Sequence, residues 1–265
     1  MEKKDDKNYL KFLPYLLACV AVVLGVVFYF NYNNSNKAVA QSEESSIPVS
    51  SKENLRSMVY GDPKTAKKGF IFYPGAKVDF KDYDELMKSI ANKGYLCISV
   101  EMPLDFAILD FTAAYRYMAS SKYKNIEEWY VGGHSLGGAM AATCASLQTS
   151  DFGVEDDVKG VILLAAYSIS DLTYSSHKNL FTKKEIVDRD VKVLSVYGTN
   201  DGVMDKEKYE KYKSNLPEKF TEVILEGGNH AQFGNYGEQD GDNVATMSAA
   251  EQIRRTAEAI VNFMG

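Results

Sequence analysis

Short apolar runs alternate with helix-length segments from about residue 57 to the end of this 265-residue chain. Several of the runs are continuously apolar, which is typical of strands that are buried on both faces of a parallel sheet. The predicted strands cover residues 69–73, 95–100, 128–131, 160–166, 191–197 and 221–225, with 59–60 assigned to an earlier strand of undefined limits. The predicted helices cover residues 83–92, 106–120, 136–147, 206–215 and 249–264. This order predicts an α/β fold with a doubly wound, mostly parallel sheet and right-handed crossovers.

The composition of the chain argues against several kinds of partner and site. The formal net charge is -6 and basic residues are interspersed with acidic ones, so no basic stripe indicates a nucleic-acid partner. No Cys-x-x-Cys or Cys/His metal spacing is present, and we expect no metal. Cys97 and Cys144 fall in a predicted strand and a predicted helix, which favours buried free thiols, with a disulfide between them as the less favoured alternative.

An uncharged apolar segment runs from Phe12 to Phe30. As a helix it would span about 28 Å, close to the hydrocarbon core of a membrane at about 30 Å. Several lysines precede the segment and only Lys37 follows it closely, so the positive-inside rule predicts a cytoplasmic N-terminus. The sequence therefore predicts a cytoplasmic segment at 1–11 and a transmembrane signal anchor at 12–32, with the rest of the chain outside the cytoplasm.

Two alternatives to an uncleaved, single-pass anchor in the cell membrane remain. Ala38-Val39-Ala40 resembles a signal-peptide cleavage site, which would release a secreted protein. Cys19 ends a loose lipoprotein box, but the residues that follow it are apolar, whereas polar residues normally follow a lipidated cysteine. Residues 33–56 are rich in Ser, Asn and Glu and are interpreted as a flexible linker, which leaves 57–265 as the folded domain.

A glycine-rich turn lies between the predicted strand 128–131 and the helix that follows it. It reads GGHSLGG at residues 132–138 and contains the motif Gly-x-Ser-x-Gly. In this strand–turn–helix context the motif holds a serine in a strained conformation, and the flanking glycines let the strand and the helix approach. The serine also stands at a helix N-terminus, where N–H groups favour developing negative charge. We therefore predict Ser135 as a nucleophile.

A serine hydroxyl needs a base to take its proton, and the chain has three histidines. His134 adjoins the nucleophile and is expected to pack beneath the site, while His177 lies in a polar stretch that indicates a solvated loop. His230 follows the last predicted strand, where a loop can return its imidazole to the carboxyl edge of the sheet. We predict His230 as the base.

The acid that orients the base is expected after another strand at the same edge. Asp201 stands in the loop GTNDG directly after the strand 191–197 and is the predicted acid. Asp205 and Asp171 are the alternative candidates for the acid. Asp205 is expected to cap the helix that begins there. The chain order Ser, Asp, His is the order of α/β-hydrolases.

An oxyanion needs two backbone N–H donors. The first is predicted at Leu136, the residue after the nucleophile. The second is predicted at Ala76, in the loop after the strand 69–73, because Gly75 permits the tight turn that points the Ala76 N–H inward.

Together, the stretches 133–137, 198–202 and GGNHAQFG at 227–234 resemble the α/β-hydrolase family, and most of all its small bacterial membrane-anchored or exported members. The resemblance covers residues 57–265. It implies a doubly wound sheet, a Ser–Asp–His catalytic triad and no cofactor. In one respect the chain departs from many members, which carry His-Gly before the oxyanion residue where this chain has Pro74-Gly75.

The expected function is that of a serine hydrolase which cleaves a carboxylic ester or related acyl bond of a small-molecule substrate through an acyl-enzyme. The segment between the strands 160–166 and 191–197 is too short for a large cap, so the cap is expected to be minimal and the site to be shallow or covered only by a small flap. The acidic loop 235–243 either borders this site or is an ordinary solvated loop, and the second interpretation is favoured. The alternative to an enzyme is a catalytically silent binding protein with the same fold at the cell surface.

Overall fold

The computed structural model describes residues 56–147, 158–173 and 191–265. The chain divides into two units, Met1–Asn54 and Leu55–Gly265, and the second is described below. The predicted anchor at 12–32, nearly all of the predicted linker, and His177 lie outside the described residues. In the three ranges that the structure describes, no helix combines the length and the apolar character that a membrane crossing requires.

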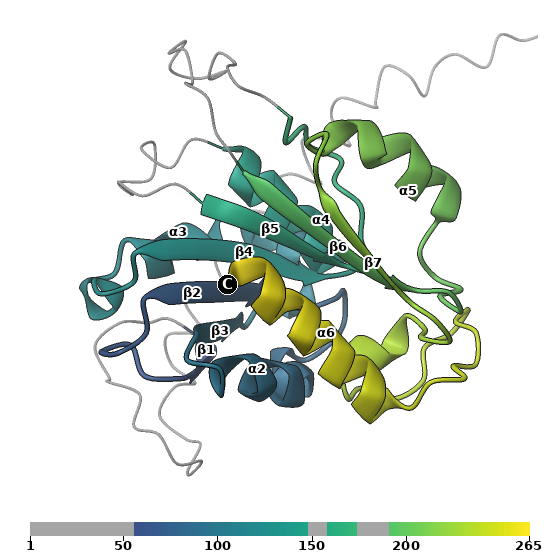
Figure 1. Ribbon diagram of the computed structural model, residues 1–265, viewed down its shortest axis with the longest axis horizontal. Helices are drawn as coiled ribbons and strands as arrows, with labels where there is room; N and C mark the ends of the chain where they lie inside the picture. The colour runs from purple at the N-terminus through teal and green to yellow at the C-terminus, as the bar shows by residue number, and fades with distance from the viewer. Residues whose placement is uncertain (1–55, 148–157, 174–190) are drawn as a thin grey trace, which may run out of the picture. The chain divides into compact units, whose positions relative to one another are not determined.

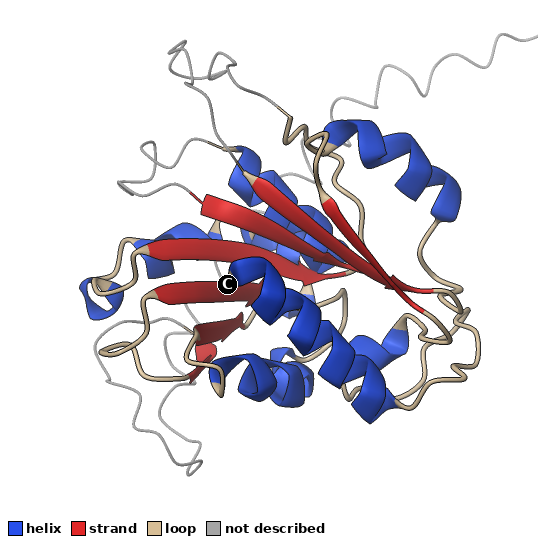
Figure 2. Cartoon of the chain, in the orientation of Figure 1, coloured by secondary structure: helices blue, strands red, loops and turns tan. Residues whose placement is uncertain are grey.

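A central sheet of seven described strands organises this unit (Figures 1 and 2). The strands are β1 (Ser57–Tyr60), β2 (Lys68–Tyr73), β3 (Leu96–Val100), β4 (Glu128–His134), β5 (Val158–Leu164), β6 (Lys192–Gly198) and β7 (Thr221–Leu225). Their order is β1-β3-β2-β4-β5-β6-β7, and every neighbouring pair is parallel except β1 with β3. The prediction of a mostly parallel α/β sheet is confirmed.

The order of the strands reverses between β2 and β4. From β2 the chain moves outward to β3 and then returns to the other side of β2 to form β4. The loops after β2 and β4 therefore leave the carboxyl edge side by side in opposite directions. In open α/β sheets ligands bind at such a topological switch point.

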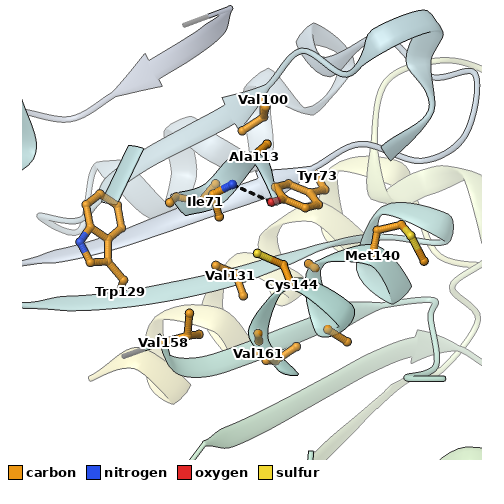
Figure 3. Close-up of a cluster of buried hydrophobic side chains, with 14 of the residues drawn as sticks. Ile71, Tyr73, Val100, Ala113, Trp129, Val131, Met140, Cys144, Val158 and Val161 are labelled. Atoms are coloured by element: carbon orange, nitrogen blue, oxygen red, sulfur yellow. Dashed lines mark hydrogen bonds between the residues drawn. The ribbon is translucent and has the colours of Figure 1, made fainter. Parts of the chain in front are cut away.

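Helices cover both faces of the sheet (Figure 1). The helices are α2 (Asp84–Ala91), α3 (Ala113–Met118), α4 (Leu136–Ser146), α5 (Lys206–Tyr212) and α6 (Ala249–Met264). Helices α3 and α4 share one buried apolar cluster with Ile71 and Val131, part of which Figure 3 shows, whereas α2 and α6 share another with Phe70 and Ile162. Neighbouring residues of a strand point to opposite faces, so Phe70 and Ile71 enter different clusters. Strands covered in this way require continuously apolar runs.

The predicted helix 106–120 is wrong, because the segment is broken into a 3-10 turn (Ala107–Asp110) and the short helix α3. The buried hydroxyl of Tyr73 occupies the break. It accepts a hydrogen bond from the backbone N–H of Ala114 (2.7 Å) and donates one to the carbonyl of Phe111 (3.0 Å). A side chain from β2 thus replaces backbone partners that a continuous helix would supply.

A smaller difference concerns the end of a strand, whereas the cysteines agree with the prediction. Strand β4 continues through the two glycines to His134, because β2 and β5 pair with it over this length. Cys97 and Cys144 are free and buried, as the favoured interpretation expects. Burial raises the pKa of the Cys144 thiol to about 12, so both burial and protonation keep this side chain unreactive.

Candidate active site

Ser135 occupies the turn between β4 and α4. Its backbone angles are φ 53 and ψ -123, a strained conformation for a residue with a side chain. The backbone N–H of Ser135 donates to the carbonyl of Leu164 (2.9 Å) at the end of β5, which fixes the turn against the neighbouring strand. The residue lies at the carboxyl edge of the sheet and is half-buried.

The glycines on either side of Ser135 bring this turn against the end of β2. A Cβ atom on Gly137 would lie 2.2 Å from the carbonyl oxygen of Tyr73 and 2.3 Å from that of Pro74. A Cβ atom on Gly133 would lie 2.4 Å from the same Tyr73 oxygen. Only glycine fits at these two positions, so the nucleophile turn is held directly beside the loop that follows β2.

The backbone N–H groups of Ala76 and Leu136 lie beside this turn and have no hydrogen-bond acceptor among the described residues. Leu136 is the first residue of α4, where an N–H has no acceptor within the helix. On either side of Ala76 the N–H groups are engaged, that of Gly75 with the Tyr83 hydroxyl (3.0 Å) and that of Lys77 with the Asp105 carbonyl (2.9 Å). The N–H of Ala76 is therefore unpaired where both of its neighbours are engaged, whereas that of Leu136 is one of several unpaired N–H groups in the first turn of α4.

Asp201 and His230 form a buried hydrogen bond. Nδ1 of His230 lies 2.9 Å from Oδ2 of Asp201, and the two side chains are 1% and 0% exposed. The other oxygen, Oδ1, accepts from the backbone N–H groups of Val203 (2.9 Å) and Met204 (2.8 Å). A carboxylate only accepts, so Nδ1 of His230 carries the proton and Nε2 is left with a free lone pair.

Nε2 of His230 is buried and has no hydrogen-bond partner in the described part of the chain, Ser135 included. The imidazole nevertheless lies beside the nucleophile turn, because its ring centre is 4.5 Å from that of His134, the residue before Ser135. Hydrogen bonds between a nucleophile and its base are often long before substrate binds and tighten in the complex. The ring that carries this nitrogen therefore packs against the residue before the strained serine.

His134 packs beneath the site, as predicted. Its Nδ1 lies 2.9 Å from the hydroxyl of Tyr83, which also accepts the N–H of Gly75. Burial, and then the neighbouring imidazole of His230, hold the pKa of His134 well below its ordinary value, so this ring is neutral. A neutral His134 either accepts the Tyr83 proton at Nδ1 or donates its own proton there, according to its tautomer. This buried network links the nucleophile turn to the loop that carries Ala76.

Two loops at the carboxyl edge carry the predicted acid and base. The acid loop, residues 199–204, follows β6, and the base loop, residues 226–234, follows β7. The loops are in direct contact, because a Cβ atom on Gly198 would lie 2.1 Å from the carbonyl oxygen of Gly228. The backbone N–H of Asn200 also donates to that oxygen (2.9 Å). Adjacent strands thus deliver the two members of the pair to one place.

Comparison with known proteins shows the family. Residues 69–254 match the model of the alpha/beta hydrolase family. The chain belongs to this family. No curated protein matches the chain.

Solved structures resemble this α/β-hydrolase in fold. Est1E from Butyrivibrio proteoclasticus, with ferulic acid bound, has a TM-score of 0.52 and 11% identity, over 79% of this chain and 95% of that chain. A lipase-esterase related protein from Clostridium acetobutylicum has a TM-score of 0.53 and 14% identity, over 79% and 99%. A monoacylglycerol lipase from Paleococcus ferrophilus has a TM-score of 0.52 and 14% identity, over the same shares. At these identities the similarity shows the fold.

The alternative candidates for the acid of this α/β-hydrolase have other partners. Asp205 caps α5 by accepting from the backbone N–H of Lys208 (3.0 Å), as predicted. Asp171 accepts from the N–H (2.8 Å) and the hydroxyl (2.6 Å) of Thr173. A buried serine on β6, Ser195, shares a hydrogen bond with the Tyr209 hydroxyl (2.9 Å) and has ordinary strand geometry.

Sequence reasoning missed the residues that hold the base loop of the α/β-hydrolase. Gln252 on α6 is fully buried, accepts from the backbone N–H of Asn229 (3.0 Å) and donates to its carbonyl (2.7 Å). A glutamine on the apolar face of the last helix is the signal that could have identified this contact.

Among the described residues, no group of three or more His, Cys, Asp or Glu side chains is arranged to hold a metal ion.

Proposed function

We propose that this α/β-hydrolase is a serine hydrolase that cleaves carboxylic ester or related acyl bonds through an acyl-enzyme on Ser135. His230 acts as the base and Asp201 orients it. The observation that carries the proposal is the fully buried hydrogen bond between Asp201 and His230, in a ring that packs against the residue before the strained serine. The same carboxyl edge supplies the two unpaired N–H groups of Ala76 and Leu136.

In the proposed reaction, Nε2 of His230 takes the proton of the Ser135 hydroxyl as its oxygen attacks the acyl carbon. The carbonyl oxygen becomes an oxyanion, which the N–H groups of Ala76 and Leu136 stabilise. Each such donor contributes a rate factor of about 10²–10³. His230 then donates its proton to the leaving alcohol, and a water molecule activated by the same nitrogen releases the acid and restores Ser135.

Exposed apolar side chains favour a substrate with an apolar moiety. Leu104, Ile108 and Leu109 are 60%, 55% and 42% exposed and follow the carboxyl end of β3, and Ile169, 51% exposed, follows that of β5. These strands flank β2 and β4, whose loops carry the proposed oxyanion donors and nucleophile. An ester panel of graded acyl length, with a feruloyl ester included, tests the preference. We expect kcat/KM to rise with acyl length, and a preference for acetyl esters would contradict this expectation.

A fluorophosphonate probe tests the proposed function directly. The full-length protein should be labelled, and Ser135→Ala should abolish labelling because the probe reacts with an activated serine. Ser89→Ala on α2, where the hydroxyl bonds only to the Glu85 carbonyl, is the matched control and should label as wild type. A folded wild-type protein that the probe does not label would replace the proposal with a catalytically silent binding protein.

We further propose that residues 12–32 anchor the enzyme in the cell membrane with its catalytic domain outside the cytoplasm. The support is the uncharged apolar segment and the lysines that precede it. Protease added to intact cells should then remove the catalytic domain while a cytoplasmic marker protein survives. Protection of the catalytic domain would contradict the orientation, and its recovery in the medium without protease would favour cleavage near Ala40.

A further inference from the structure

One carboxylate outside the proposed triad contacts both loops that carry its acid and its base. Oδ1 of Asp242 accepts from the backbone N–H of Gly202 (3.0 Å), the residue after Asp201. Oδ2 of Asp242 accepts from the backbone N–H of Ala231 (2.9 Å), the residue after His230. A single side chain therefore holds the residues that directly follow both members of the buried pair.

The remaining contacts of Asp242 serve the same arrangement. Oδ1 also accepts from the N–H of Asn243 (2.9 Å), whose carbonyl accepts from the Asn229 side chain (2.9 Å) in the base loop. Within the described ranges, no Lys, Arg or His side chain forms an ion pair with Asp242. Its acceptor capacity is therefore directed at backbone N–H groups, which is how a carboxylate fixes a loop.

Further hydrogen bonds attach the two loops on the N-terminal side of each member of the pair. The acid loop is attached before Asp201, through the N–H of Asn200. The base loop is attached before His230, through Asn229 and the carboxamide of Gln252. Asp242 adds an attachment after each catalytic residue, so that both loops are held on both sides of the residue they present.

We propose that Asp242 is a positioning residue that fixes the acid loop against the base loop and so maintains the hydrogen bond between Asp201 and His230. The inference rests on the proposed function and gives a role to one carboxylate of the acidic loop 235–243. Asp242 does not touch the reacting atoms, so it acts through the geometry of the pair. A misplacement of about 1 Å in such a pair costs on the order of 10²-fold in rate.

The test compares Asp242→Ala, Asp242→Asn and the control Asp240→Asn in the full-length protein. Asp240 is exposed and two residues away, so it matches the charge change without the loop contacts. Kinetics on p-nitrophenyl acetate should show kcat lowered by about 10²-fold in Asp242→Ala, by less in Asp242→Asn, which retains one acceptor oxygen, and not in Asp240→Asn. KM should stay near the wild-type value in all three.

A spectroscopic measurement separates positioning from folding. The proton that His230 Nδ1 donates to Asp201 gives a downfield NMR signal, which Asp242→Ala should broaden or abolish while the remaining amide spectrum stays native. Unchanged kcat, or an unchanged downfield signal in folded Asp242→Ala, would overturn the proposal. If Asp242→Ala does not fold, the test uses Asp242→Asn instead. Faster hydrogen exchange of the Gly202 and Ala231 amides together with a lower kcat would support the positioning role of Asp242, and wild-type exchange rates and kcat would refute it.

The signal also separates this proposal from the proposed function. It reports the Asp201–His230 bond whether or not Ser135 reacts. If fluorophosphonate does not label the protein but its downfield signal depends on Asp242, the positioning role of Asp242 stands and the proposed hydrolase function does not.

Discussion

The imidazole rings of His134 and His230 lie with their centres 4.5 Å apart, and only His230 is paired with a carboxylate. His134 bonds to the neutral hydroxyl of Tyr83 instead. The pKa of His134 is lowered by burial and by its histidine neighbour, so the folded protein keeps this ring uncharged. Two histidines in contact thus have different partners, and one of them is available as a base.

The neutral state of His134 predicts how stability depends on pH. Below about pH 6.5 the unfolded chain binds a proton at this histidine, whereas the folded protein does not until a lower pH. The contribution of neutral His134 to the free energy of unfolding should therefore be fully present above this pH and be lost as the pH is lowered. The slope of this loss is at most about 1.4 kcal/mol per pH unit for one group. Denaturant unfolding between pH 7 and pH 5 measures the slope.

The control for this effect is a variant that cannot titrate. His134→Gln removes the proton site, so its stability should fall less steeply than that of wild type over the same pH range. Equal slopes for the two proteins would show that His134 does not contribute to the pH dependence.

Removal of the proposed base should abolish most of the activity. We expect His230→Ala to lose several orders of magnitude in kcat, because loss of a triad base alone costs about 10⁶-fold in a well-studied serine hydrolase. Hydrolysis of p-nitrophenyl acetate measures the loss. His177→Ala is the comparison, since the sequence places that histidine in a polar stretch, and an equal loss in both variants would contradict the assignment of His230.

Tyr83 connects the loop after β2, which carries the proposed oxyanion donor Ala76 and is called the oxyanion loop below, to the turn that carries Ser135. Its hydroxyl can be removed by a single substitution. Tyr83→Phe leaves the N–H of Gly75 and Nδ1 of His134 without their partner in a fully buried place. An unsatisfied buried polar group costs about 1–3 kcal/mol, so we expect a lower unfolding free energy. We also expect kcat to fall about 10-fold or more, because Ala76 directly follows Gly75 and a displaced donor stabilises the oxyanion less well.

A second tyrosine provides the comparison for this prediction. The hydroxyl of Tyr95 makes one long hydrogen bond of 3.4 Å to the carbonyl of Val261, away from the site. Tyr95→Phe should therefore leave kcat near the wild-type value. If Tyr83→Phe behaved in the same way, the oxyanion loop would not depend on this network.

Local patterns in the sequence were enough to predict most strands and the residues of the proposed triad. Strand 221–225 has the predicted limits. Ser135, Asp201 and His230 could be proposed because each follows a recognisable strand, and parallel strands end at one edge. The structure then brings His230 to Asp201, which are 29 residues apart.

Contacts between distant segments could not be read from these patterns. The break in the segment 106–120 depends on the hydroxyl of Tyr73, which is 38 residues from Phe111. Asp242 reaches Gly202 across 40 residues and Ala231 across 11, so nothing local distinguishes it from Asp240. Such long-range hydrogen bonds are set by the packing of the loops and not by the periodicity of any element.

The strands that the proposed reacting groups follow have a consequence for how new specificities arise in this fold. Every group assigned to bond cleavage comes from the segments after β2, β4, β6 and β7, and none comes from the segment that follows β5. Insertions there can reshape the surroundings of the reaction centre while the reacting groups keep their supports. An engineer who seeks variants with altered selectivity should therefore diversify the positions around Ile169 first.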